Sequence, residues 1–306
     1  MNDFLDSALL RCFLAVLEHR TLTVAADHLC VTQSALSKSL RRLEEDLGVP
    51  LFQRTPGGMV PTTYGLALSR RAHMISMESR SARSELQILR EGGVGSLTVG
   101  AGPLWSVSLL PEAISQMTRR NANLHFKVVS GVLSNLLPQL LKGEIDVVCS
   151  ALDFPDHPEL IKRKILVSEH VVVAHKMHPL AKMKSVDAQS LADFPFVGIA
   201  DDYAGIERME KYFTLHGLVA PKLAVEATSM EMLLSILATG DFLSSISSQL
   251  LVRGKSLGLQ ALPIAQSFWK FDAGIVHRRT PHASALIELL HRELSNHSGL
   301  AMVSKT

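Results

Sequence analysis

The stretch TVAADHLCVTQSALSKSLRRLEEDLG, residues 23–48, contains two short helical patterns that meet at CVTQS. Thr23 is placed to cap a first helix with small residues at Ala25 and Ala26, and Thr32 is placed to cap a second helix. The second helix has one apolar stripe, formed by Leu36, Leu40, Leu43 and Leu47. A single long helix has no use for two cap residues this close together, so the sequence predicts a helix-turn-helix at about residues 23–42.

The second helix presents a polar face when its leucine stripe is turned inward. This face consists of Gln33, Ser34, Ser37, Lys38 and Arg41. In a major groove the first turns of a helix approach the bases, where Gln can pair with adenine, Ser with several base edges, and Lys or Arg with guanine or phosphate. The net charge of +2 gives no global sign of nucleic-acid binding, so the prediction of a double-stranded DNA partner depends on this local geometry.

The longer run LLRCFLAVLEHRTLTVAADHLCVTQSALSKSLRRLEEDLGVPLFQRT, residues 9–55, resembles the N-terminal domain of LysR-type transcriptional regulators. It carries the family's elements in order: F-x-x-V-x-E, AA-x-x-L, a near match to SQ-x-A-x-S, LE-x-x-LG and LF-x-R. The resemblance implies a winged helix-turn-helix over residues 1–63, with Arg54 on the DNA backbone. The wing TPGGMVPTT lacks the arginine often found at its tip and has Pro61 where leucine is usual, so a DNA contact from the wing stays open.

Two further departures from the family pattern lie in the second helix: Thr32 stands where serine is usual, and Ser34 stands where proline is common. The DNA-binding candidates are Thr23, Thr32, Gln33, Ser34, Ser37, Lys38, Arg41 and Arg54.

Residues 64–90 contain no proline and a single early glycine, which predicts a long linker helix. Its heptad positions are Leu68, Ala72, Ile75, Ser79, Ala82, Leu86 and Leu89. This seam favours a coiled coil between two copies of the chain, and a dimer can read two half-sites on DNA. The alternative is a helix that lies on the core of its own domain.

After the break EGGVG at 91–95, strand-like and helical segments alternate, which predicts an α/β domain over 91–306. LTVGA, HFKVVSG and IDVVCSA are strand-like, and LLPEAISQM and SNLLPQLLKG are helical. We expect lobe I at about 95–165 and 265–306, and lobe II at about 166–264. This order resembles the two-lobed, periplasmic-binding-protein-like (type 2) effector domain of the LysR-type family. Residues 226–243 look most like the branch that includes regulators of galactose-binding-protein and protocatechuate-pathway genes.

Ligands in such folds bind beyond the carboxyl ends of the strands. The effector-binding candidates are therefore Gly102, Pro103, Leu104, Trp105, Ser130, Gly131, Ser150, Ala200, Asp201, Thr228 and Ser229. Each hydroxyl among them could instead be a helix cap, and Trp105 could be a core residue. Their hydroxyl and N–H donors predict a small-molecule effector, for which an anionic group is one option.

Other classes of protein have weaker support in the sequence. Cys12, Cys30 and Cys149 are far apart and in no metal-ligand spacing, so neither a disulfide framework nor a zinc site is expected. An enzyme would use histidines such as His175 with His178, or His277 with His282. The pair His175 and His178 follows a strand and has no third ligand at helical spacing, and no P-loop, GxSxG or HExxH occurs. An enzyme and a module that acts only through protein contacts remain alternatives.

The N-terminal run is wrong for a secretory signal and too short for a membrane span. We therefore expect a cytoplasmic transcriptional regulator without a cofactor, metal or membrane partner. It is expected to form a homodimer or homotetramer, and a contact with RNA polymerase stays open. The effector, the target genes and the direction of regulation do not follow from the residues.

Overall fold

The computed structural model describes residues 7–90, 95–264, 268–279 and 285–303. The chain forms two compact units, Met1–Gly92 and Gly93–Thr306. The linker residues 91–94 and His282 lie outside the described residues, as do the side chains of Leu86 and Leu89. Among the helices that are described, none combines the length and the hydrophobicity that a membrane crossing requires.

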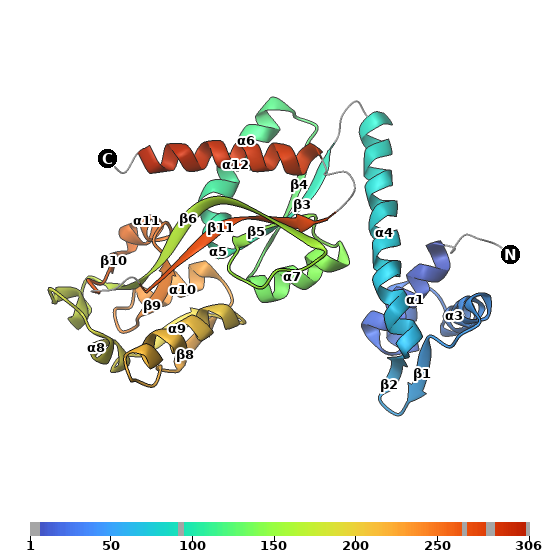
Figure 1. Ribbon diagram of the computed structural model, residues 1–306, viewed down its shortest axis with the longest axis horizontal. Helices are drawn as coiled ribbons and strands as arrows, with labels where there is room; N and C mark the ends of the chain where they lie inside the picture. The colour runs from blue at the N-terminus through green and yellow to red at the C-terminus, as the bar shows by residue number, and fades with distance from the viewer. Residues whose placement is uncertain (1–6, 91–94, 265–267, 280–284, 304–306) are drawn as a thin grey trace. The chain divides into compact units, whose positions relative to one another are not determined.

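The first unit is a three-helix bundle with a two-stranded wing and a long final helix (Figure 1). Its elements are α1 (Ser7–His19), α2 (Leu22–His28), α3 (Gln33–Leu47), β1 (Phe52–Thr55), β2 (Gly58–Pro61) and α4 (Thr63–Arg90). Ala25 and Ala26 are buried in its core beside Phe13 and Leu36. These small side chains let α2 and α3 approach closely, as the sequence pattern predicts.

Thr21, and not Thr23, is the N-cap of α2: its hydroxyl accepts a hydrogen bond from the Val24 N–H at 3.3 Å. Thr23 lies inside the first turn and is exposed, so its predicted role as a cap is wrong. Both residues have the chemistry of a cap, but only Thr21 has the extended backbone (φ −130°, ψ 142°) that a cap requires. The cap of α3 is Thr32, as predicted, and its hydroxyl accepts from the Ala35 N–H at 3.2 Å.

Thr21→Ala is expected to destabilise α2 by about 1 kcal/mol, because one N–H of the first turn loses its acceptor. Thr23→Ala is the matched control and is expected to change stability by less than about 0.5 kcal/mol. Hydrogen exchange of the α2 amides in the full-length chain measures both effects. Faster exchange in the Thr23 variant than in the Thr21 variant would contradict the cap assignment.

The end of α3 is fixed by Glu44, whose Oε1 accepts the backbone N–H groups of Leu51 at 2.7 Å and Phe52 at 3.2 Å. Leu36, Leu40 and Leu43 are buried as the stripe predicts, but Leu47 is 39% exposed. The helix is capped at the next residue, Gly48, which is left-handed (φ +69°), so Leu47 lies where the chain turns away from the core.

The wing is attached to the bundle through its backbone. The Met59 N–H donates to the Arg20 carbonyl at 2.6 Å. Gly58 has φ +116°, and a Cβ at this position would lie 2.4 Å from the Arg20 oxygen. Only glycine allows this approach, so Gly58 determines how the wing docks on the start of α2.

The long helix α4 begins as part of the bundle core. Ala72 is fully buried there, and Leu68 packs against the same cluster. The first two positions of the predicted seam, Leu68 and Ala72, therefore pack in the core of their own domain. This part of α4 follows the alternative prediction, a helix that lies on its own domain. Ile75, the third position, is 38% exposed and is available to a partner.

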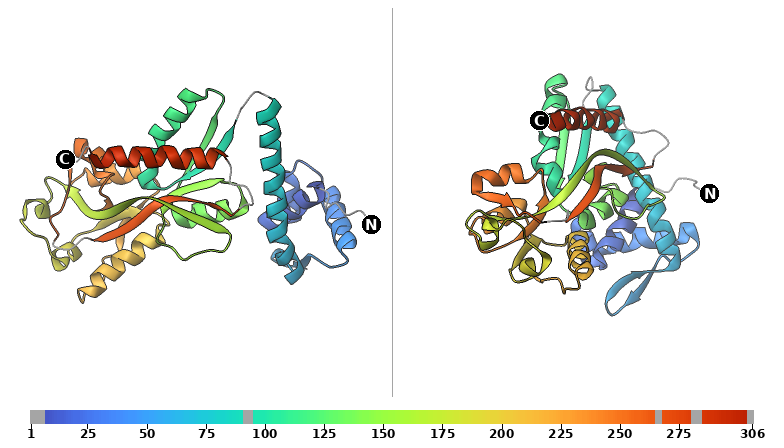
Figure 2. Two further views of the ribbon diagram at one scale, coloured as in Figure 1. Left: turned by 45° about the horizontal axis from the view of Figure 1, so that its top comes forward. Right: turned by 60° about the vertical axis from the view of Figure 1, so that its left-hand side comes forward.

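The second unit is built on a seven-stranded sheet with the order β10-β6-β11-β5-β3-β4, and β9 pairs with β6. In lobe I, β3 (Ser96–Ala101) is parallel to both β4 (His125–Ser130) and β5 (Val147–Ala151), which confirms the predicted β-α-β-α-β order. The helices are α5 (Pro103–Val107), α6 (Leu109–Arg120), α7 (Leu133–Lys142) and α12 (Ala285–Val303). Figure 2 shows α12 lying beside α6.

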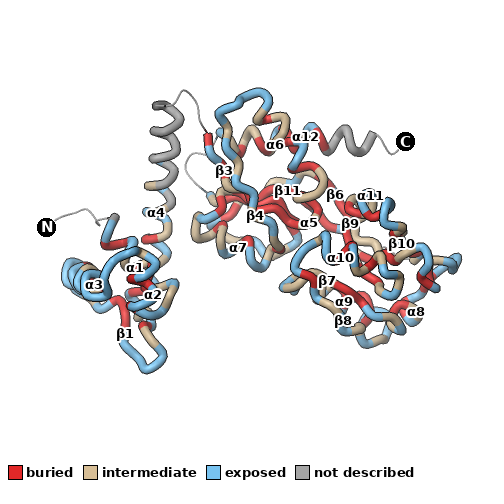
Figure 3. The backbone as a smooth tube through the Cα atoms, turned by 180° about the vertical axis from the view of Figure 1, so that it is seen from behind, coloured by how far each residue is buried: buried red, intermediate tan, exposed pale blue. Residues whose placement is uncertain are grey.

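Strand β5 is buried on both faces, which explains why Val147, Val148 and Cys149 are apolar in succession. Figure 3 shows that its neighbour β11 is also largely buried. Val147 and Cys149 face the cluster formed with α6 and α12, whereas Val148 faces the cluster formed with α7. Side chains of a strand alternate between its faces, so one strand connects the two cores of lobe I.

Lobe II contains a smaller sheet, β7 (Phe196–Ile199) parallel to β8 (Leu223–Ala227), with helices around it. Its other elements are α8 (Ala188–Ala192), α9 (Tyr203–Leu215), α10 (Met230–Leu237), β9 (Ser244–Ser247), α11 (Leu251–Gly254) and β10 (Leu259–Ala261), with short 3-10 turns at Pro179–Lys182 and Lys255–Leu257.

Two antiparallel strands run through both lobes: β6 (Leu160–His175) and β11 (Trp269–Arg278). β6 pairs with β11 up to His170 and then with β9 and β10. The chain therefore passes between the lobes in these two strands. The register of the pair shifts between Ala273 and Gly274.

Candidate functional site

The predicted DNA-facing residues of α3 lie on its solvent side. Gln33, Ser34, Lys38 and Arg41 are exposed, and Ser37 is half-buried. The hydroxyl oxygens of Thr32 and Ser34 are 3.1 Å apart, so the cap residue also orients Ser34. Thr23 and Arg54 are exposed on α2 and β1 of the same unit. Because the leucine stripe anchors α3 in the core, its polar face is held on a rigid element.

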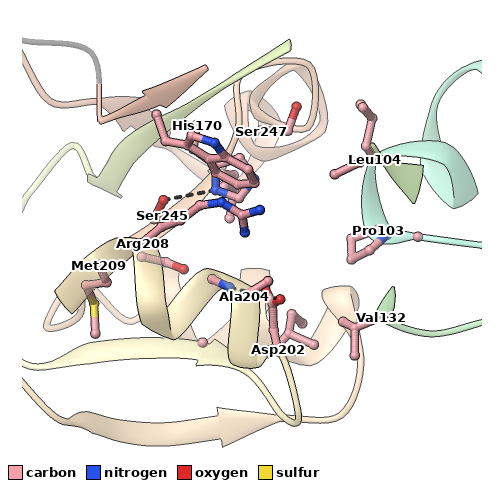
Figure 4. A pocket seen from close by; sticks show the side chains of 18 of the residues that line it. Pro103, Leu104, Val132, His170, Asp202, Ala204, Arg208, Met209, Ser245 and Ser247 are labelled. Carbon is pink, nitrogen blue, oxygen red and sulfur yellow. Dashed lines mark hydrogen bonds between the residues drawn. The ribbon is translucent and has the colours of Figure 1, made fainter. Parts of the chain in front are cut away.

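A cavity of about 140 Å³ lies between lobe I and lobe II. Lobe I contributes the turn after β3, the end of β5 and part of β11. Lobe II contributes β7, α9 and β9. Figure 4 shows Pro103, Leu104 and Val132 facing His170, Arg208 and Ser245 across this space. Most of the lining is apolar, which is typical of small-molecule sites.

The cavity brings together about half of the predicted effector-binding residues: Gly102, Pro103, Leu104, Trp105 and Ser150. Trp105 is both core and lining, since it is 1% exposed and borders the cavity. The remaining candidates, Ser130, Gly131, Ala200, Asp201, Thr228 and Ser229, are not among its lining residues. Ser229 caps α10, with its hydroxyl accepting the Met232 N–H at 3.2 Å.

The charged groups of the cavity come from segments that the sequence patterns did not single out. Arg208 on α9 forms an ion pair with Asp153, which follows β5 in lobe I. The guanidinium carbon of Arg208 lies 3.4 Å from the centre of the Trp269 ring, and Trp269 stacks on Phe271 at 4.4 Å. A cation over an aromatic face is stabilised by the ring quadrupole, so this stack holds the guanidinium in place.

His170 of β6 completes the aromatic wall. Its Nδ1 is 3.0 Å from the Ser245 hydroxyl, and its ring is 4.6 Å from Trp269. Burial, together with the nearby Arg208 charge, lowers the pKa of His170 to about 3. The imidazole is therefore neutral at pH 7 and adds no positive charge beside Arg208.

Asp202 is the second carboxyl group of the cavity. It caps α9, with its Oδ1 accepting the Gly205 N–H at 3.1 Å. Burial raises the pKa of Asp202, and the neighbouring Asp153 raises it further, while the Gly205 bond and Arg208 lower it. The two carboxyl groups thus compete for the positive charge of Arg208.

One signal in the sequence points to Arg208. It lies four residues before Tyr212, which belongs with Met209 and Phe213 to the buried face of α9. A charged residue at this spacing shares the apolar face of its helix, and such a residue needs a partner inside the protein. For Asp153 and Trp269 the local sequence holds no comparable signal.

As the pH falls, His170 is expected to lower the free energy of unfolding of the second unit, which contains the ligand cavity and is called the effector unit below. At pH above about 6.5 the imidazole is neutral in the folded and the unfolded chain and adds no pH dependence. Between about 6.5 and the folded pKa of about 3, only the unfolded chain binds the proton, so stability falls by up to about 1.4 kcal/mol per pH unit.

The comparison of wild type with His170→Gln at pH 7.5 and pH 5.0 measures this effect. Urea unfolding followed by tryptophan fluorescence reports on the effector unit, because Trp105 and Trp269 are the two tryptophans of the chain. The variant should lose less stability than wild type on acidification. His178, His277 and His291 also have pKa values lowered mainly by burial, and they are common to both proteins. Equal losses would mean that His170 is protonated in the folded state.

The paired histidines have structural roles in the described part of the chain. His175 Nδ1 accepts the Met177 N–H at 3.3 Å, and His178 Nδ1 accepts the Leu180 N–H at 3.2 Å. His277 Nδ1 is 2.9 Å from the Arg278 carbonyl. Nowhere among the described residues do three His, Cys, Asp or Glu side chains gather as metal ligands would.

Comparisons with known proteins identify a family for each of the two units of the chain. Residues 7–66 match the family described as bacterial regulatory helix-turn-helix protein, lysR family, and residues 90–299 match the LysR substrate binding domain. The HTH-type transcriptional regulator GbpR of Azospirillum brasilense is 31% identical over 78% of this chain and 72% of its own length.

Two solved structures have the same fold. Full-length OxyR from Pseudomonas aeruginosa has a TM-score of 0.65 at 20% identity, covering 96% of this chain and 95% of that one. Full-length CbnR in complex with its target DNA has a TM-score of 0.63 at 19% identity, covering 96% of this chain and 100% of that one. The chain belongs to the LysR family and is a DNA-binding transcriptional regulator with an effector-binding domain.

Proposed function

We propose that the chain binds promoter DNA sequence-specifically as a homo-oligomer, and that a small molecule in the cavity between the lobes changes this binding. The observation that carries the proposal is the anchored helix α3, whose polar face is exposed while its leucine stripe is buried. The DNA-bound structure of CbnR, which shares the fold, supports a DNA partner.

The readout is divided between two kinds of contact. Gln33, Ser37 and Lys38 lie in the first two turns of α3 and read base edges, with Ser34 oriented by Thr32. Arg41, Arg54 and Thr23 are exposed at positions suited to phosphate contacts. Phosphate contacts set the register of the protein, and base contacts determine the sequence that it prefers.

Oligomerisation places two copies of α3 on one site. Ile75 and Met74 of α4 are exposed apolar side chains beyond the part of the helix that its own bundle covers. Pairing of two α4 helices buries such side chains and supplies the two-fold arrangement that half-sites require. A homodimer satisfies this requirement, and a homotetramer combines two such pairs.

The chain acts by binding and not by catalysis, and it works in the cytoplasm, where bacterial promoters are. The histidines discussed above serve as turn caps or hydrogen-bond partners of neighbouring groups. Burial strongly raises the pKa of Cys149, so its thiol stays protonated and is a poor nucleophile.

The test is binding of the purified full-length chain to labelled DNA from upstream of its own gene, measured by fluorescence anisotropy against a shuffled fragment of equal length. We expect at least about 1,000-fold tighter binding to the genomic fragment, together with a footprint of two half-sites. Equal affinities for the two fragments at several salt concentrations would reject sequence-specific regulation.

A further inference from the structure

The ion pair between Arg208 and Asp153 joins the two lobes across the ligand cavity. Arg208 belongs to α9 of lobe II, and Asp153 follows β5 of lobe I. Their side chains are 19% and 28% exposed, so the pair is largely shielded from water. The other ion pairs among the described residues connect groups within lobe I. The carboxylate of Asp153 therefore already binds Arg208, the cationic group of the cavity.

The guanidinium has donors left for a ligand. Arg208 carries five N–H groups, and the ion pair with Asp153 runs through one nitrogen, Nη2. Trp269 covers one face of the group but leaves its edge open. Figure 4 shows the guanidinium pointing into the space opposite Pro103 and Leu104.

Two residues that line the cavity each hold a buried polar atom without a partner in the described part of the chain. Trp105 Nε1 in lobe I and Ser244 Oγ in lobe II are buried and have no hydrogen-bond partner among the described residues. Both residues line the cavity, and each is 1% exposed. The guanidinium of Arg208 can only donate hydrogen bonds, and its ion pair uses one nitrogen, so the cavity is suited to a ligand with acceptor oxygens.

The charged groups of the cavity determine how such a ligand can bind to Arg208. Asp153 and Asp202 already provide two carboxyl groups for one guanidinium, and His170 is neutral. An anion added beside them would be repelled, whereas an anion that replaces Asp153 on Arg208 keeps the local charge unchanged. Asp153 can then turn to solvent, since its side chain is already partly exposed. A ligand amine could pair with the carboxyl groups, but it would leave the remaining N–H donors of Arg208 without an acceptor.

We propose that the effector is a small apolar carboxylic acid whose carboxylate displaces Asp153 from Arg208, so that the Asp153–Arg208 ion pair is the contact that the ligand exchanges. This inference rests on the proposed function, because it names the ligand class and the switch of that same cavity. The volume of about 140 Å³ is close to that of an apolar protein cavity that holds benzene, which limits the apolar body to about one ring.

The exchange also explains how binding reaches both lobes. While Asp153 holds Arg208, the lobes are joined by two side chains of the protein. A ligand that replaces Asp153 remains bonded to Arg208 in lobe II and faces Pro103 and Leu104 of lobe I (Figure 4). Only such a difference in contacts between the two states lets a ligand shift their populations.

The test compares the full-length wild type with Asp153→Asn, using phenylacetate and cyclohexanecarboxylate as probes and their primary amides as neutral analogues. Isothermal titration calorimetry at pH 7.5 measures the affinities. The neutral amide introduced by this substitution pairs weakly with Arg208, so the fraction of protein with a free guanidinium rises. We expect both acids to bind the variant at least tenfold more tightly than wild type, and both amides to bind the two proteins equally.

Two further variants separate this exchange from a general effect of charge. Asp272→Asn removes a carboxylate that pairs with Lys164 at 2.7 Å within lobe I and is not among the residues that line the cavity, so this variant should bind the acids like wild type. Arg208→Gln should lose any preference for acids over amides. Circular dichroism spectra that match wild type establish that each variant is folded.

The proposal is overturned if neither acid binds Asp153→Asn, if the acids gain less than about threefold, or if the amides gain as much as the acids. An equal gain in Asp272→Asn also overturns it, because the effect would then come from net charge. The DNA-binding test above uses no ligand, so specific promoter binding with no acid selectivity would leave the proposed function in place and reject only this inference.

Discussion

Glu44→Ala is expected to destabilise the connection between α3 and the wing by about 2–4 kcal/mol. The carboxylate accepts two backbone N–H groups, those of Leu51 and Phe52, and hydrogen bonds to a charged acceptor contribute about 1.5–3 kcal/mol each. Without Glu44, two partly buried donors lose their acceptor and Phe52 loses its fixed position in the core. Hydrogen exchange of residues 49–60 in the full-length chain measures the local opening.

Two controls sharpen this expectation. Glu44→Gln keeps a carbonyl acceptor and should lose less than half as much stability. Glu45→Ala removes the neighbouring exposed carboxylate and should change exchange very little. If Glu44→Ala exchanged no faster than Glu45→Ala, the two bonds from Glu44 would have no part in holding the wing.

Gln33→Ala is expected to remove discrimination at one base pair, a loss of about 1–3 kcal/mol on the preferred site and almost none on random DNA. Gln33 begins α3 directly after its cap and is exposed, so the truncation removes a base contact without disturbing the core. Affinities for the site and for its single-base variants, measured at one salt concentration, reveal which position loses its preference.

Arg54→Ala is the contrasting variant for this prediction. An exposed arginine on β1 that contacts phosphate should weaken binding to every sequence alike and reduce the salt slope by about one ion. Equal losses on specific and random DNA for Gln33→Ala would place that residue among the phosphate contacts instead.

The helix-turn-helix could be predicted because each of its determinants is local. Leucines at helical spacing and a cap at Thr32 are visible within a few turns of helix, and the structure places them as expected except for Leu47, which is exposed. The error at Thr23 has the same origin, because Thr21 and Thr23 have identical side chains and only the backbone around Thr21 distinguishes them.

The first half of β6 has no strand pattern in the sequence, because it carries the charged run Lys162, Arg163 and Lys164. Each charge has a partner outside the strand: Asp156, Glu288 and Asp272, respectively. Two of these partners lie far along the chain, on α12 and β11, so no local pattern reveals that the run can enter a sheet.

The sequence predicts only part of the ligand cavity, because the order of the strands also depends on contacts between distant segments. The turn after β3 and the end of β5 lie at central strands, and their residues line it. Ser130 ends the edge strand β4, and Thr228 follows a strand of the separate two-stranded sheet, so the carboxyl ends of these strands do not meet at the cavity. Strand order cannot be read from the pattern of one sequence.

We expect the register shift between Ala273 and Gly274 to act as a pivot between the two lobes. A bulge concentrates twist at one point of a strand pair, and here it lies where β11 leaves lobe I for the cavity wall. Gly274 packs against the Arg163 backbone, where a Cβ would lie 2.0 Å from the carbonyl oxygen. This close packing limits how far the two strands can move relative to each other at the register shift. We expect the lobes to rotate by small angles on the microsecond-to-millisecond timescale of collective motions, while both strands stay intact. The response time to a ligand is then set by the rates at which the ligand binds and dissociates.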